Sequence, residues 1–221
     1  MMFKIDLHVH TALGGDSFIK PDELVARCIE VGLDAVCVTE HNSYSVSEPF
    51  SDIAHDTGFP IFRGMEYNAA EGHLLIYGVK TGKSDLPPKL PIQRAMNWVH
   101  SRGGIAIPAH PFQRDMLGRC VGNRVFDLEN LTAMEVINGS ASAEENEKAA
   151  EAATRLGISG TGGSDAHGLI VLGRAYTLFP ASVNTETELV RALRSGGYKA
   201  CWNNEYYELD HKGRLTGSAP S

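Results

Sequence analysis

Short apolar runs alternate along the chain with segments whose apolar residues recur at helical spacing. The apolar runs predict strands, and the amphipathic segments predict helices. Strands that are apolar along most of their length are buried on both faces, which favours a parallel sheet or barrel with helices outside. The predicted strands span residues 3–9, 35–39, 60–65, 73–79, 105–109, 133–137, 158–160 and 175–179, and the predicted helices span residues 21–30, 92–101, 144–156 and 187–195.

The first predicted strand ends in an unusual run of polar residues, Asp6-Leu7-His8-Val9-His10. Because side chains alternate across a strand, Asp6, His8 and His10 are expected to share one face. Two imidazoles and a carboxylate on one face predict a metal site, and the alternative for this segment alone is a solvated edge strand.

Other residues of the kinds that bind metals follow the ends of later predicted strands. In a β/α barrel these carboxyl ends converge on one face, where such folds place their chemistry. His73 begins its strand, so an antiparallel segment is needed to bring it to the same rim. The remaining histidines, His55, His100 and His211, lie on helical or tail segments and are expected outside the site. The strand-end residues are Glu40, His41, Glu66, His110, Asn138, Asp165 and His167.

The candidate ligands are imidazoles and carboxylates, which suit Zn²⁺, Mn²⁺ or Fe²⁺ at a catalytic centre. The four cysteines, Cys28, Cys37, Cys120 and Cys201, are scattered and are expected to be reduced. So many candidate ligands imply two or three divalent ions, with Glu66 or Asp165 as a possible bridge. Closely spaced ions activate water and neutralise charge on the attacked group, which is the logic of two-metal hydrolysis.

The 221 residues, 43% of them hydrophobic, suit one globular domain. A net charge of −7 argues against a strong nucleic-acid surface, although bound cations would still admit an anionic substrate. No apolar run approaches the roughly 20 residues of a membrane span, and no signal peptide precedes the first strand. We therefore expect a cytoplasmic protein with no membrane partner, and its oligomeric state is left open.

Five segments of the chain, in this order, resemble the motifs of the PHP (polymerase and histidinol phosphatase) superfamily. They are Asp6-Leu7-His8-Val9-His10-Thr11, Thr39-Glu40-His41, Gly64-Met65-Glu66, Ala109-His110-Pro111 and Gly163-Ser164-Asp165-Ala166-His167. Residues 138–195 resemble the carboxyl-terminal segment of many stand-alone PHP proteins. The resemblance implies a distorted seven-stranded (β/α)7 TIM-like barrel, a single α/β domain over residues 1–212, with 213–221 as a flexible tail.

The resemblance also implies a di- or trinuclear metal centre. The first ion would take His8, His10, Glu66 and Asp165, the second Glu66, His73 and His110, and the third Asp16, His41 and His167. Asp6 would lie behind this centre as a catalytic support that orients an imidazole.

Two positions depart from the family pattern. The second motif is usually Thr-Asp-His, and here Glu40 stands in place of the aspartate. The loop after His10 carries Gly14-Gly15 before Asp16, one residue more than usual. A dinuclear centre without the third ion is therefore an alternative.

The resemblance implies a phosphoesterase that acts on a small phosphomonoester or nucleotide through metal-activated hydroxide. His167 or Asp165 would protonate the leaving oxygen, and Arg114 and Arg119 would hold the phosphate. One alternative is hydrolysis of a C–N or carboxylic ester bond by the same centre, and another is a non-catalytic metal-binding PHP module. Residues 80–91 are either a substrate lid or a plain connecting loop.

Overall fold

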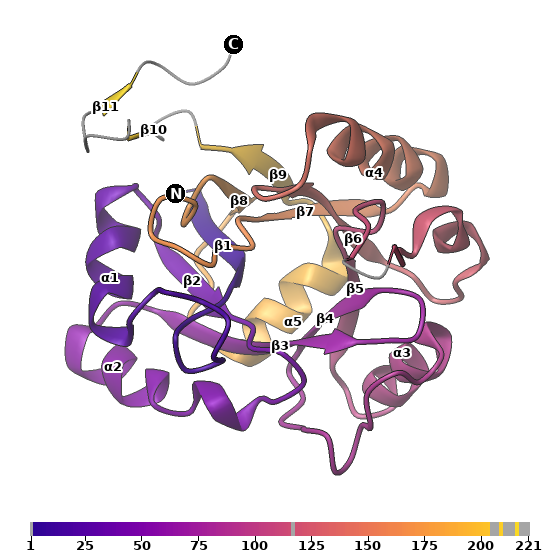
Figure 1. Cartoon of the computed structure of the whole chain (residues 1–221), viewed down its shortest axis with the longest axis horizontal. Helices are drawn as coiled ribbons and strands as arrows, with labels where there is room; N and C mark the ends of the chain where they lie inside the picture. The colour runs from indigo at the N-terminus through magenta and orange to yellow at the C-terminus, as the bar shows by residue number, and fades with distance from the viewer. Residues whose placement is uncertain (1, 116–117, 204–207, 210–214, 217–221) are drawn as a thin grey trace.

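The computed structural model describes residues 2–115, 118–203, 208–209 and 215–216 of the chain. Figure 1 shows strands gathered at the centre and helices around them. The strands are β1 (Phe3–Val9), β2 (Ala35–Val38), β3 (Ile61–Asn68), β4 (His73–Tyr77), β5 (Ile105–Ala109), β6 (Ala133–Asn138), β7 (Ser159–Gly163), β8 (Ala175–Phe179), β9 (Lys199–Trp202), β10 (Glu208–Leu209) and β11 (Leu215–Thr216). The helices are α1 (Pro21–Glu30), α2 (Phe50–Thr57), α3 (Ile92–His100), α4 (Ala143–Leu156) and α5 (Glu186–Ser195), with short 3-10 helices η1 (Ser45–Ser47) and η2 (Gly122–Asp127).

Seven strands form one curled mixed sheet in the order β5-β4-β3-β2-β1-β8-β9. Only the β1–β2 and β2–β3 neighbours are parallel, and the other four pairings are antiparallel. The strands β6 and β7 form a separate parallel pair, with β6 packed near β5 and β7 near β1. The α/β class expected from the sequence is confirmed as a mixed fold with a curled seven-stranded sheet, and the complete (β/α)7 barrel stays a prediction.

A tight connection explains the first antiparallel pairing. Only residues 69–72 join β3 to β4, and the Ala69 N–H donates to the Gly72 carbonyl at 2.8 Å. A parallel crossover needs a dozen or more residues, so this connection forces a hairpin. The hairpin places His73 opposite both Asn68 and Ala109. His73 therefore reaches the rim where the other strands end.

The apolar core forms three clusters. The innermost cluster joins residues of β1 to β5 with Leu189, Val190 and Leu193 of α5, so α5 closes one end of the curled sheet. A second cluster packs α3 and α4 against β3 to β6, and a third packs α1 and α2 against β1 to β3. The opposite end, where β1, β2, β3 and β5 finish, is left for polar side chains.

The helix α2 and the strand β9 are among the elements that the apolar pattern did not predict. The helix α2 buries only Phe50 completely, so its apolar periodicity is weak. The edge strand β9 is half-buried or exposed along its length. The predicted tail at 213–221 lies outside the described residues except for Leu215–Thr216.

The segment from 80 to 91 is a connecting loop pinned at several points. Leu86 is buried in the core, and the Tyr67 hydroxyl donates to the Pro87 carbonyl at 2.7 Å. The Tyr44 N–H donates to the Thr81 carbonyl at 2.9 Å. Within the part of the chain that the structure describes, no helix has the length and apolar character to cross a bilayer.

Candidate metal centre

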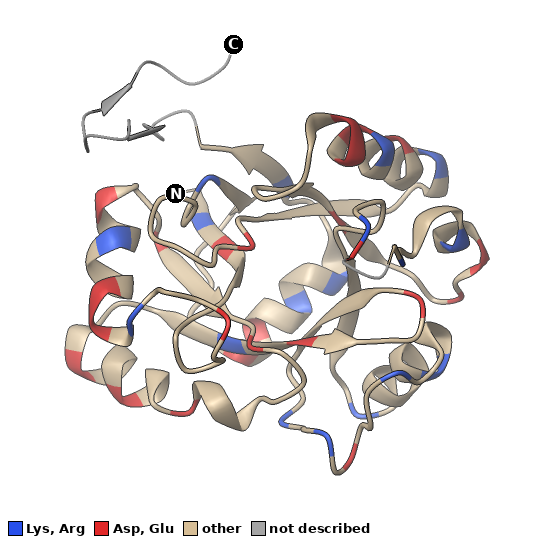
Figure 2. Cartoon of the chain, in the orientation of Figure 1, with Lys and Arg blue, Asp and Glu red and all other residues tan. Residues whose placement is uncertain are grey.

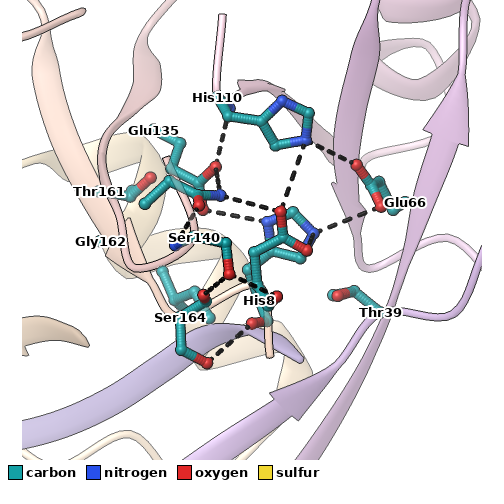
Figure 3. A network of polar contacts seen from close by, with 12 residues as sticks. His8, Thr39, Glu66, His110, Glu135, Ser140, Thr161, Gly162 and Ser164 are labelled. Atoms are coloured by element: carbon teal, nitrogen blue, oxygen red, sulfur yellow. Dashed lines mark hydrogen bonds and ion pairs between the residues drawn. The ribbon is translucent and has the colours of Figure 1, made fainter. Parts of the chain in front are cut away.

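The carboxylate of Glu66 lies at the centre of the polar rim. It projects from β3, is 1% exposed, and contacts five imidazoles. One oxygen lies 2.7 Å from His73 Nδ1 and 3.0 Å from His110 Nε2. The other lies 3.1 Å from His10 Nε2, 3.2 Å from His41 Nδ1 and 3.4 Å from His8 Nε2. Figure 3 shows Glu66 facing His8 and His110 across this rim.

The first predicted ligand group is brought together around the end of β1. The Nε2 atoms of His8 and His10 lie 3.1 Å apart, and both lie 3.4 Å from Asp165 Oδ1. Together with Glu66, these side chains offer four ligand atoms within 4.8 Å of one another. All four residues are buried.

The second group consists of Glu66, His73 and His110, which also lie within 4.8 Å of one another. His110 and Asp165 both follow their strands in a left-handed backbone conformation, with φ values of 27° and 52°. Non-glycine residues rarely adopt this conformation, and such strain is concentrated at functional sites. The strained turns aim both side chains back over the strand ends.

The third group lies on the open side of the centre. His41 Nε2 is 3.2 Å from Asp16 Oδ2, and His167 Nε2 is 3.9 Å from the same oxygen. His10 completes this group with one ring nitrogen, which lies within 4.8 Å of ligand atoms of Asp16, His41 and His167. The side chains of His41, Asp16 and His167 are 30%, 38% and 40% exposed. The longer loop after His10 therefore still delivers Asp16 to the site.

Glu135 supports the centre and was not predicted from the sequence. One of its oxygens accepts a hydrogen bond from His8 Nδ1 at 3.1 Å. The other accepts from the His110 N–H at 2.8 Å and from Asn138 Nδ2 at 3.0 Å, and Figure 3 shows Glu135 beside His110. Asn138 also donates to Asp165 Oδ2 at 3.2 Å. In the sequence Glu135 is only a carboxylate within an apolar run, which is unusual because a buried charge needs partners, but its role follows from its contacts.

Asp6 contacts backbone groups around the centre, and its Oδ1 accepts from the N–H of His8 at 3.2 Å. The pairing of β1 with β2 shifts register between Asp6 and Val9, so side-chain alternation is broken there. The Asp6 oxygens accept backbone hydrogen bonds from Ser164 at 2.8 Å and Gly173 at 3.0 Å. Burial raises the pKa of Asp6 to about 6 despite these bonds. Asp6 therefore anchors the loop that carries Asp165, while Glu135 holds the imidazole of His8.

The predicted phosphate-binding arginines lie in different places. Arg119 lines a small cavity beside His73 and His110, and its guanidinium forms an ion pair with Asp115 at 2.7 Å. Arg114 donates to the Gly118 carbonyl at 2.7 Å and lines a separate cavity of about 400 Å³ next to α4. Arg119 is thus the arginine that borders the histidine cluster.

Opposite charges inside the rim shift the titration of its members. Burial lowers the pKa of His10, but hydrogen bonds to Asp165 and Glu66 outweigh this effect and raise it to about 9. Burial likewise favours neutral carboxyls, but the charge of His8 and the neighbouring imidazoles hold the pKa of both Glu66 and Asp165 well below the usual range. The ionised carboxylates of the rim therefore stabilise positive charge beside them.

These residues fit divalent cations. Because the Glu135 carboxylate can only accept, His8 donates from Nδ1, and a cation that displaces the proton on Nε2 would find a lone pair there. That lone pair faces His10 Nε2 at 3.1 Å, with two carboxylates beside it. A cation bound between these atoms would relieve the repulsion, and an imidazole–carboxylate donor set suits Zn²⁺, Mn²⁺ or Fe²⁺.

Two family models match the chain. The family model of the PHP domain matches residues 6–83, and the model of a PHP-associated region matches residues 143–198. The chain belongs to the PHP superfamily. The two matches of this PHP protein contain every candidate ligand except His110, which lies between them.

Several known proteins are similar to this PHP protein. An uncharacterized protein of Methanocaldococcus jannaschii is 27% identical over 145 residues, which cover 61% of this chain and 81% of the relative. A two-domain protein of Bacteroides vulgatus, which contains a predicted PHP-like metal-dependent phosphoesterase, matches with a TM-score of 0.72 and 19% identity over 92% of this chain and 66% of its own. A lesion-specific endonuclease of Pyrococcus furiosus matches with a TM-score of 0.64 and 16% identity over 90% of this chain and 58% of its own. At these identities the two structures show a shared fold.

Proposed function

We propose that this PHP protein is a metal-dependent hydrolase, and specifically a phosphoesterase that acts on a small phosphomonoester or nucleotide. The observation that carries the proposal is the Glu66 carboxylate within 3.4 Å of five imidazoles at one rim of the fold. The Bacteroides vulgatus protein, which is described as containing a predicted PHP-like metal-dependent phosphoesterase, supports the same reaction class.

The side chains of this PHP protein would hold two or three divalent ions. His8, His10, Glu66 and Asp165 would hold one, and Glu66, His73 and His110 a second. When bound, such ions supply activated water at neutral pH and stabilise negative charge on a phosphoryl group. Glu66 belongs to both groups, so it would be shared between them.

The source of the proton for the leaving oxygen depends on whether Asp16, His41 and His167 bind a third ion. Asp165 is unsuited to donate, because neighbouring imidazoles hold its pKa well below the usual range. His167 is 40% exposed, and its Nδ1 lies 3.1 Å from the Asp165 carbonyl, which leaves Nε2 toward the open side. In a two-ion centre His167 would donate the proton, and in a three-ion centre it would be a ligand with His41 and Asp16.

The expected substrate is compatible with the charge of the chain. Acidic and basic residues are interspersed over the helices in Figure 2, and the net charge is −7. Such a surface favours a small phosphorylated substrate, drawn by cations in the rim, over a long polyanion.

A substrate panel tests the proposal. Protein purified without chelators and supplied with Mn²⁺ is assayed on p-nitrophenyl phosphate, bis(p-nitrophenyl) phosphate and p-nitrophenyl acetate, with Glu66→Gln as the inactive control. We expect metal-dependent turnover of the phosphomonoester that Glu66→Gln lacks. Turnover of the acyl ester alone would establish the alternative, a carboxylic ester hydrolase. Stoichiometric metal with no turnover on a broader panel of phosphate and amide substrates would indicate a non-catalytic module.

A further inference from the structure

Two buried polar atoms near His10 face one another without hydrogen bonds. Glu40 follows β2, and its Oε1 accepts from both the N–H and the hydroxyl of Thr11. Its Oε2 lies 4.0 Å from Nδ1 of His10. Among the described residues neither Oε2 nor Nδ1 has a hydrogen-bond partner, and both side chains are 0% exposed. Two unpaired polar groups in the interior are energetically unfavourable, so their retention indicates a function.

Gly14 provides the space for this arrangement. A Cβ atom at position 14 would lie 2.1 Å from Glu40 Oε2, far inside contact distance. The second motif usually has an aspartate where this chain has Glu40, and the longer side chain extends into the volume that a side chain at position 14 would fill. A glycine at position 14 is therefore required to make room for the Glu40 carboxylate.

We propose that Glu40 is the positioning residue for His10 and that Gly14 is its necessary partner. A hydrogen bond from His10 Nδ1–H to Glu40 Oε2 would fix the tautomer that leaves Nε2 free, and a ring shift of about 1 Å from the present 4.0 Å would form it. Imidazoles that bind metals generally donate their second nitrogen to a carboxylate or carbonyl. The inference rests on the proposed metal centre, in which His10 Nε2 is a ligand.

The neighbouring histidine shows the same design. His8 donates from Nδ1 to Glu135 at 3.1 Å and presents Nε2 to the rim. In the opposite tautomer, His10 would carry a proton on Nε2, directed at the Nε2 of His8 3.1 Å away. Glu135 and Glu40 would thus prepare His8 of β1 and His10, which directly follows β1, in the same way.

A double-mutant cycle tests the pair. The affinity of the full chain for Zn²⁺ is measured by competition with a chromophoric chelator for wild type, Glu40→Asp, Gly14→Ala and the double variant, with exposed Glu48→Gln as the control. Glu40→Asp is expected to weaken binding about 10- to 100-fold. Gly14→Ala is expected to do the same in the wild-type background, because its methyl group displaces Oε2, and to add little in the Glu40→Asp background.

A spectroscopic readout separates positioning from a general loss of structure. In the Zn²⁺-loaded wild type, ¹⁵N NMR of the imidazoles should show His10 protonated at Nδ1, and Glu40→Gln should weaken this signature while circular dichroism stays unchanged. Fully additive effects of Gly14→Ala and Glu40→Asp, or wild-type affinity in Glu40→Gln, would overturn the inference alone. A wild-type protein that binds no Zn²⁺ would overturn the proposed metal centre as well.

Discussion

Replacing Glu135 by glutamine tests how the outer carboxylates prepare the centre. Glu135 accepts three hydrogen bonds, from His8 Nδ1, from the His110 N–H and from Asn138 Nδ2. A glutamine of the same shape has one acceptor oxygen. If that oxygen keeps the bonds to His110 and Asn138, the amide NH₂ faces His8 Nδ1 at about the present 3.1 Å.

His8 must then accept at Nδ1 and carry its proton on Nε2. That proton would lie between His8 and His10, where the first ion is expected, so the protein must reverse the tautomer before binding. Loss of such outer partners typically weakens metal binding about 10- to 100-fold, equivalent to about 1.4–2.7 kcal/mol. Loss of a hydrogen bond to a buried charged group also removes about 1.5–3 kcal/mol from the unfolding free energy of the metal-free protein.

The assay is a chelator-competition titration with Zn²⁺ and Mn²⁺, combined with urea unfolding of the metal-free protein. Glu151→Gln on the exposed face of α4 is the matched control and should keep wild-type affinity and stability. Wild-type affinity in Glu135→Gln would refute the reasoning that this carboxylate sets the tautomer of His8.

Three further predictions concern the ligands, the pH dependence and the fold. Asp165→Ala and His10→Ala should abolish hydrolysis and lower the metal content while circular dichroism stays unchanged, and wild-type turnover in either would show that the ligand assignment is wrong. Because the pKa of His10 is raised from 6.5 to about 9 in the folded state, its contribution of about 3 kcal/mol is fully present below pH 6.5 and lost as the pH rises through 9. Urea unfolding of the metal-free protein should show this decline, and a His10→Ala protein with the same decline would contradict the assignment. Ser142→Ala removes the capping box of α4 and should lower the unfolding free energy by about 1 kcal/mol without changing metal affinity.

The strand-end residues were predictable because apolar runs mark where strands finish. His8, Glu66, His110 and Asp165 all come together as that pattern implies. His73 also required an antiparallel segment, and the four-residue connection between β3 and β4 provides it.

Other features depend on geometry that apolar periodicity does not encode. The register shift in β1 interrupts the simple alternation from which Asp6, His8 and His10 were expected to share one face. Glu135 lies within an apolar strand, and only its tertiary contacts reveal its function. The antiparallel pairings of β8 and β9 likewise depend on long-range contacts, so a parallel barrel was expected where the sheet is mixed.

Elemental analysis of the protein, purified without chelators and then loaded with Mn²⁺, Zn²⁺ or Fe²⁺ and desalted, tests the central claim most directly. The account predicts two or three ions per chain, with three favouring ligand roles for Asp16, His41 and His167 and two favouring His167 as the proton donor. Glu66 contacts a histidine in each of the three ligand groups, namely His8, His73 and His41. The Glu66→Gln protein should therefore retain fewer than one ion per chain. Less than one ion per wild-type chain under all three loading conditions would contradict the metal centre.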